Sequence, residues 1–297
     1  MIWLALTVAC SLAVAAVFKV SERRGLDRTA VLTVNYAVAG AVAAVLLGGE
    51  ARAQEEVEAG FVALGAATGA LFIGGFYVFA YAIREAGMGL AAAVMRLSVV
   101  VPFLASWLAW GERPTGVQLL GLALAGAAFF LLARPAAEPV RSRAPADGSA
   151  GRGGTRTAVA LGLLFLAGGL ADTAMKAYDE AFGATGSRPL FLLLVFGVAF
   201  LVGLGGVVAA GVRTGRWPRA AAAGWGAALG LANYGSVEFV LRALGELQGT
   251  FVFPANNVAI VMGAALLGVA VWGERLSRRN WLGLGVAALA LVFLAPR

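Results

Sequence analysis

Residues 88–110 read MGLAAAVMRLSVVVPFLASWLAW, an apolar stretch in which Arg96 is the one charged side chain. About twenty such residues cross the ~30 Å hydrocarbon core of a bilayer as a helix. Within lipid every backbone polar group must be paired inside the segment, so a helix is the expected conformation. The stretch therefore predicts a transmembrane helix with a guanidinium group near its middle.

Similar apolar blocks recur along the whole chain. The chain has 297 residues, of which 61% are hydrophobic and 13% are charged, and a soluble domain of this length needs far more polar surface. We therefore predict an all-α integral membrane protein with ten transmembrane helices. These spans are expected at about 2–19, 29–48, 61–83, 88–110, 115–133, 158–177, 190–211, 220–242, 249–271 and 280–295.

A repeated turn divides the chain into two halves. The sequence Trp-Gly-Glu-Arg occurs at 110–113 and at 272–275, and Leu-Gly-Leu follows each copy at the same distance. An odd number of spans in each half forces the second half to insert in the opposite direction, which is the inverted-repeat design of many transporters. The expected organisation is two inverted five-helix repeats.

The repeat boundaries follow from composition. We expect the first five-helix repeat at 1–134 and the second at 157–297. Residues 135–156 are rich in Pro, Gly, Ala and Arg, which is typical of a flexible linker.

Basic residues in the loops indicate the orientation. Cytoplasmic loops carry an excess of Lys and Arg. Four of the predicted connections hold most of the basic residues and all lie on one side, whereas the loop at 50–58 on the other side is acidic. We expect a cell (inner) membrane protein with the linker in the cytoplasm and both termini outside. The basic residues are Lys19, Arg23, Arg24, Arg28, Arg141, Arg143, Arg152, Arg156, Arg213, Arg216, Arg219, Arg275, Arg278 and Arg279.

Arg96 is the main candidate for solute binding. A charge at the bilayer centre costs about 2.5–3.5 kcal/mol on insertion scales, so it needs a partner. A guanidinium group can bind a carboxylate or phosphate through paired hydrogen bonds. The alternative is an internal ion pair with Asp172 or Glu238 that only fixes packing.

Amides and aromatic hydroxyls supply further candidates. Asn256 and Asn257 lie deep in the ninth span after Pro254, and the repeat alignment matches Asn257 to Met95, which is next to Arg96. The two regions are therefore expected to meet. Asn233, Tyr234 and Asn35 lie within other spans. All of these side chains can line a cavity, or they can simply join neighbouring helices.

Carboxylates and lysines within the spans have separate expected roles. A carboxylate in a dry cavity can exchange a proton, so Asp172 and Glu238 are candidates for proton coupling. Lys176 is four residues after Asp172, which permits an ion pair on one helix face. Lys19, at the end of its span, is expected to act as a snorkelling anchor.

Two structural features are also expected. Pro102 and Pro254 are expected to kink their helices and to free backbone carbonyl groups. Glu112 and Glu274 precede the spans that follow the repeated turn, where a carboxylate can accept from free N–H groups at a helix N-terminus.

Several classes of function lack support. There is no His, and Cys10 is the sole cysteine, so neither a metal site nor an internal disulfide is expected. No nucleophile elbow or phosphate-binding loop occurs, so we expect neither an enzyme nor a cofactor. No basic soluble domain is present to bind nucleic acid. The expected partners are a small-molecule solute, membrane lipids and protons, and both halves in one chain permit a monomer.

The chain resembles the EamA-like permeases of the drug/metabolite transporter superfamily. The resemblance covers nearly the whole chain except the linker and rests on the repeated turn and on four segments. The first span departs from the family because it lacks the usual Trp-Gly segment. The four segments are Val94 to Pro102 (VMRLSVVVP), Gly169 to Thr173 (GLADT), Asn233-Tyr234 and Phe253 to Val258 (FPANNV).

This resemblance implies alternating access through a cavity between the halves. Family members move amino acids, nucleotide sugars, phosphorylated sugars and drugs, often as exporters. With Arg96, the expected function is secondary transport of a small anionic or zwitterionic solute. The alternatives are an exporter of cationic drugs by proton antiport through Asp172 or Glu238, a non-transporting membrane subunit, and a membrane enzyme with Lys19 and Glu22 near one face.

Overall fold

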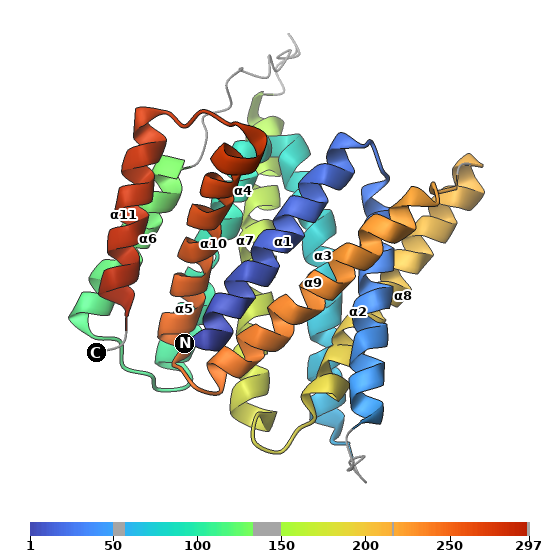
Figure 1. Ribbon diagram of the computed structural model, residues 1–297, viewed down its shortest axis with the longest axis horizontal. Helices are drawn as coiled ribbons and strands as arrows, with labels where there is room; N and C mark the ends of the chain where they lie inside the picture. The colour runs from blue at the N-terminus through green and yellow to red at the C-terminus, as the bar shows by residue number, and fades with distance from the viewer. Residues whose placement is uncertain (50–56, 133–149, 216, 296–297) are drawn as a thin grey trace. The chain divides into compact units, whose positions relative to one another are not determined.

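The computed structural model describes residues 1–49, 57–132, 150–215 and 217–295, and all regular secondary structure within them is helical (Figure 1). Within these residues there are eleven helices. They are α1 (Ile2–Arg23), α2 (Arg28–Gly48), α3 (Ala59–Ala86), α4 (Met88–Leu97), α5 (Val100–Leu108), α6 (Gly116–Leu132), α7 (Ala150–Phe182), α8 (Arg188–Thr214), α9 (Ala221–Leu244), α10 (Gly249–Trp272) and α11 (Arg278–Leu294). Each of the ten predicted spans falls on helix, and the fourth is divided between α4 and α5.

Seven candidate spans in the described residues are long and apolar enough to cross a membrane. One of them, Leu90–Leu108, combines α4 and α5. Helices α6 and α11 have 17 residues each and are shorter. Helix α9 has 24 residues but carries Asn233, Glu238 and Arg242, which lower its hydropathy. These features support a multi-pass membrane protein.

Short polar side chains begin several of the helices. Asp27 caps α2 by accepting a hydrogen bond from the backbone N–H of Ala30 at 2.9 Å. Ser187 caps α8 in the same way through Leu190, at 3.2 Å, and Pro189 lies in the first turn of that helix. Such caps satisfy N–H groups that have no partner within the helix, which is why the chain turns at these residues.

The chain forms two compact units, each built from both halves of the sequence. Unit 1 comprises Met1–Ile73 and Ala174–Leu247. Unit 2 comprises Gly74–Thr173 and Gln248–Arg297. Helices α3 and α7 therefore contribute to both units. The predicted repeats at 1–134 and 157–297 describe sequence halves, and neither half is by itself a compact unit.

Small residues allow close helix contacts in unit 1. Helix α2 packs against α8 and α9, and α1 packs against α9 (Figure 1). A Cβ atom on Gly226 of α9 would lie 2.8 Å from the backbone oxygen of Val31, and one on Gly230 would lie 2.6 Å from that of Asn35. Glycine at these positions lets α9 approach the α2 backbone, as is common between helices in membranes.

Unit 2 is organised around α10. This helix packs against α5, α6 and α11, and α6 and α11 lie side by side (Figure 1). A Cβ atom on Gly121 of α6 would lie 2.9 Å from the backbone nitrogen of Leu294 at the end of α11. The amide of Gln118, also on α6, donates to the Leu294 carbonyl at 3.5 Å.

The repeated turn has the same backbone geometry in both copies. Gly111 and Gly273 have φ values of +70° and +63°, which favour glycine. The N–H of Glu112 donates to Ser106 O at 3.1 Å, and that of Glu274 donates to Gly268 O at 3.0 Å.

The role expected of Glu112 needs correction. Its carboxylate accepts from the N–H groups of Gly249 and Thr250, at 2.8 and 2.7 Å. It therefore caps α10 and not the following helix, α6.

The predicted linker needs a similar correction at one end. Helix α7 begins at Ala150, so residues 150–156 are helical. Residues 135–149 of the linker, with Arg141 and Arg143, lie outside the described residues, as do Arg216 and the acidic positions Glu50, Glu55 and Glu56.

Candidate solute-binding site

The fourth span is broken beside Arg96. Helix α4 ends at Leu97 and α5 begins at Val100. Pro102 has no N–H to donate to Ser98 four residues earlier, and the Ser98 carbonyl instead accepts from Val101 N at 2.9 Å. The expected effect of Pro102 is therefore seen as a complete interruption of the helix. By contrast, α10 continues through Pro254.

Ser98 and two glycines of α7 accommodate the interruption between α4 and α5. The Ser98 hydroxyl donates to Met95 O at 2.6 Å and so satisfies a carbonyl at the end of α4. A Cβ atom on Gly168 would lie 2.7 Å from the Ser98 hydroxyl oxygen, and one on Gly169 would lie 2.5 Å from the Cβ atom of Val101. The interruption is therefore packed directly against the α7 backbone.

Arg96 is held at the end of α4 by an amide from α10. Its Nη1 donates to Asn257 Oδ1 at 3.2 Å. The Nδ2 of Asn257 donates in turn to Phe253 O at 3.1 Å, which orients the amide oxygen toward the guanidinium group. The contact agrees with the repeat alignment, which predicts that these two regions meet. The negative end of the α4 dipole also stabilises a cation in its last turn.

Asp172 and Asn256 complete the polar set in unit 2. Asp172 is half-buried on α7, one helical turn beyond Gly168, and interacts electrostatically with Arg96. Within the described part of the chain, the Asp172 carboxylate and the Arg96 guanidinium group form no direct ion pair. The Oδ1 atom of half-buried Asn256 is inaccessible and has no hydrogen-bond partner among the described residues. A guanidinium, a carboxylate and an amide with bonding capacity are thus present in one unit.

The other predicted amide and tyrosine residues lie in unit 1. Asn35 is 1% exposed on α2, and its Oδ1 has no hydrogen-bond partner within the described part of the chain. Tyr234 is buried on α9 with its ring centre 6.3 Å from that of Phe196, and Asn233 beside it is half-buried. The ring of Tyr36 also lies 6.3 Å from Phe196. Tyr234 thus belongs to an aromatic cluster.

Glu238 and the two lysines also lie in unit 1. Glu238 Oε1 accepts from Arg242 Nε at 2.6 Å and lies 3.5 Å from Arg188 Nε. Lys176 forms ion pairs with Glu180 at 2.7 Å and Asp179 at 3.4 Å, rather than with Asp172. Lys19 is half-buried near the end of α1.

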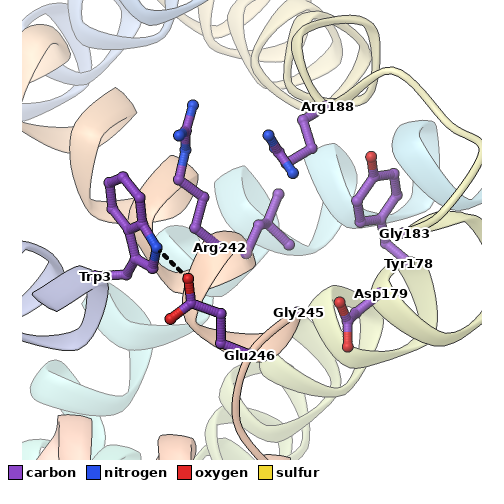
Figure 2. A pocket seen from close by; sticks show the side chains of 9 residues that line it. Trp3, Tyr178, Asp179, Gly183, Arg188, Arg242, Gly245 and Glu246 are labelled. Atoms are coloured by element: carbon purple, nitrogen blue, oxygen red, sulfur yellow. Dashed lines mark hydrogen bonds between the residues drawn. The ribbon is translucent and has the colours of Figure 1, made fainter. Parts of the chain in front are cut away.

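Sequence reasoning missed a pocket of about 320 Å³ in unit 1. It lies where α1 begins, where α7 gives way to α8 and where α9 ends. Its lining includes Trp3, Arg188, Arg242 and Glu246 (Figure 2). These charged residues occur at helix ends, where a sequence suggests only loop charges. The i, i+4 spacing of Glu238 and Arg242 was the available indication.

The described fold and its polar interior define a multi-pass helical membrane protein. Residues 1–134 match the EamA-like transporter family. This part of the chain is thus similar to EamA-like transporters, in agreement with the resemblance to the drug/metabolite transporter superfamily seen in the sequence. Transport, rather than catalysis, is what this family does.

Two further comparisons cover nearly the whole chain. An uncharacterized protein of Haemophilus influenzae is 25% identical over 299 residues, which cover 96% of this chain and 94% of that protein. A protein of known crystal structure is 13% identical and matches with a TM-score of 0.72, over 98% of this chain and 97% of that chain. The second comparison shows a shared fold alone.

Proposed function

We propose that this protein is a secondary active transporter of a small polar solute that is anionic or zwitterionic. The observation that carries the proposal is Arg96, held by Asn257 beside the break between α4 and α5. Alternating access between two inverted five-helix repeats, 1–134 and 157–297, is the mechanism that we infer. Metabolite export is the direction that the family resemblance favours.

The guanidinium group of Arg96 retains capacity for a ligand. It carries five N–H donors, and one side-chain hydrogen bond, to a neutral amide, is formed within the described residues. Asp172 balances its charge through space without a direct contact. A carboxylate or phosphate can therefore bind through the remaining donors, and such charge-assisted bonds are the strong ones. Asn256 offers a further amide for a polar solute.

Asp172 is the better candidate for proton coupling. It has no hydrogen bond or ion pair with another described residue, whereas Glu238 is already bonded to Arg242. Asp172 interacts electrostatically with Arg96. Binding of an anionic solute would compete for Arg96 and so favour protonation of Asp172. This competition would link proton movement to solute binding.

The remaining assignments concern membrane orientation, oligomeric state and the other polar residues, and the orientation follows from the loop charges. We infer a cell (inner) membrane location with the linker in the cytoplasm and both termini outside. A monomer is sufficient because one chain supplies both repeats. Asn35, Asn233 and Tyr234 are inferred to contribute to solute binding, and Lys19 and Lys176 to anchoring.

The test is transport by purified protein in liposomes, with a panel of radiolabelled amino acids, carboxylates, phosphorylated sugars and lipophilic cations. We expect Arg96→Ala to lower transport of the accepted solute at least about ten-fold, because charge-assisted hydrogen bonds are lost. Arg96→Lys is expected to retain part of the activity. The matched control is Arg84→Ala, an exposed arginine of α3 in the same unit.

Two outcomes would reject the assignment. Transport that is unchanged in Arg96→Ala removes Arg96 from solute binding. Transport confined to lipophilic cations, and abolished in Asp172→Asn, indicates a cation exporter instead.

A further inference from the structure

The pocket in unit 1 has opposite charges on its two sides. Figure 2 shows the guanidinium groups of Arg188 and Arg242 on one side and the carboxylates of Asp179 and Glu246 on the other. Three segments of the chain supply these groups, since Asp179 is on α7, Arg188 begins α8, and Arg242 and Glu246 lie at the end of α9 and just after it. A pocket polarised in this way suits a ligand with two opposite charges.

On the arginine side of the pocket, the two positive charges of Arg188 and Arg242 face one negative charge, that of Glu238. Both guanidinium groups approach the same atom, Glu238 Oε1, through their Nε atoms, at 2.6 Å for Arg242 and 3.5 Å for Arg188. Glu238 is buried behind them. Their terminal nitrogens make no further hydrogen bond within the described residues. Arg242 is hydrogen-bonded to Glu238, whereas Arg188 Nε only lies near it and makes no hydrogen bond to any described residue. Both planar groups are therefore available to bind a second carboxylate.

Trp3 contacts one residue on each charged side of the pocket. The Arg242 guanidinium lies 4.7 Å from the centre of the Trp3 ring, a stacking distance that limits its movement. The indole N–H of Trp3 donates to Glu246 Oε1 at 2.7 Å (Figure 2). One aromatic side chain therefore positions a member of each charged side.

Glu246 is the main acceptor for a ligand cation. Its Oε2 lies 3.9 Å from the amino group of Met1, a long and exposed ion pair, and its side chain is 53% exposed. Asp179, in contrast, is paired with Lys176 at 3.4 Å. An ammonium group in the pocket would therefore bind Glu246 more readily than Asp179.

We propose that this pocket binds a small zwitterion, with its carboxylate on Arg188 and Arg242 and its ammonium group on Glu246. The volume of about 320 Å³ is at the lower end of small-molecule sites and limits the ligand to amino-acid size. Trp3, Tyr178 and Leu241 leave room beside the charges for an apolar side chain. The pocket is formed by residues of unit 1, whereas Arg96 belongs to unit 2, and binding to the pocket does not depend on transport.

A matched set of ligands tests both charges. Binding to the purified full-length protein in nanodiscs would be measured by titration calorimetry with L-leucine, with 3-methylbutylamine, which lacks the carboxylate, and with 4-methylpentanoate, which lacks the ammonium group. We expect L-leucine to bind at least about ten-fold more tightly than either analogue, because each analogue loses one charged contact.

Two variants assign the binding to the pocket. Arg188→Gln and Glu246→Gln are each expected to weaken L-leucine binding at least about ten-fold. Arg213→Gln, an exposed arginine near the other end of α8, is the matched control and should bind as the wild type does. Because Arg188 also contacts Glu238, the thermal unfolding midpoint of each variant is measured without ligand. The exposed Glu246 variant keeps the test valid if Arg188→Gln unfolds.

Arg96→Ala separates this site from the proposed transport site. Retention of L-leucine binding in Arg96→Ala, with loss in Glu246→Gln, supports the pocket whether or not the protein transports L-leucine. The proposal is overturned if L-leucine does not bind the wild type at millimolar concentration, if the analogues bind equally well, or if binding is lost in Arg96→Ala alone.

Discussion

The fourth spans of the two halves end in the same turn but differ in whether the helix is continuous. In the first half α4 ends at Leu97 and α5 begins at Val100, whereas α10 in the second half is continuous from Gly249 to Trp272. Both copies end in the same turn, with matching hydrogen bonds from Glu112 N and Glu274 N to carbonyls six residues earlier. The difference therefore lies inside the span and not in its end.

The position of one proline accounts for the difference. Pro102 lies after Arg96, in the first turn of α5, where a missing N–H has little cost. Pro254 lies before Asn257, and α10 continues past it. The first copy therefore places a guanidinium at a helix end, and the second places an amide on a continuous helix. Two related spans have acquired complementary roles within unit 2.

The largest effect is expected from filling the contact that accommodates the break. Gly169→Val would add side-chain atoms where a Cβ alone already lies 2.5 Å from Val101 Cβ and 3.0 Å from Ser98 O. We expect the free energy of unfolding in mixed micelles to fall by about 3 kcal/mol, because an overpacked contact forces helices apart.

Gly162→Val on the same helix is the control for Gly169→Val. A Cβ atom on Gly162 meets nothing within 4 Å. If both substitutions lower the free energy of unfolding equally, the contact between α7 and the break is not what matters.

A smaller effect is expected at the start of α10. Glu112→Gln removes the charge that accepts from Gly249 N and Thr250 N. We expect a loss of about 1–2 kcal/mol in the free energy of unfolding, because charged acceptors form the stronger bonds to helix N-termini. Glu58→Gln, an exposed glutamate ahead of α3, is expected to change it by less than about 0.5 kcal/mol. Equal effects would show that Glu112 does not stabilise α10.

The comparison also shows what the sequence alone could reveal. The apolar block at 88–110 predicts the span, and the repeated turn predicts that Asn257 and Arg96 meet, as their hydrogen bond confirms. Both inferences depend on periodicity and alignment along the chain. Pro102 likewise predicts a disturbance in its helix.

The location of the break could not be predicted in the same way. Ser98 closes it with a side-chain hydrogen bond, and Gly168 and Gly169 make room for it, although they are distant in sequence. Glu112 gives a second example, since its partner is α10 rather than the next helix. Long-range packing decides such contacts. The pocket near Trp3 was missed for the same reason, because three separate segments supply its charges.

The smallest change in the free energy of unfolding is expected when either proline is replaced by alanine. Pro102→Ala supplies an N–H that can reach Ser98 O, and Pro254→Ala supplies one within α10. Each is expected to change the free energy of unfolding by no more than about 1 kcal/mol, since a gained hydrogen bond is offset by greater freedom of the unfolded chain. The two variants should differ in transport, however, because only Pro102 lies at the break.

Measurements of amide hydrogen exchange and of transport distinguish the two proline variants from each other. In Pro102→Ala we expect slower amide exchange at Val99 to Val101 and slower transport, because a closed helix fixes Arg96 and its neighbouring carbonyl groups. In Pro254→Ala we expect both to remain near the wild-type values, because α10 is already continuous. A larger loss of transport in Pro254→Ala than in Pro102→Ala would mean that α10, and not the broken span, controls access to Arg96.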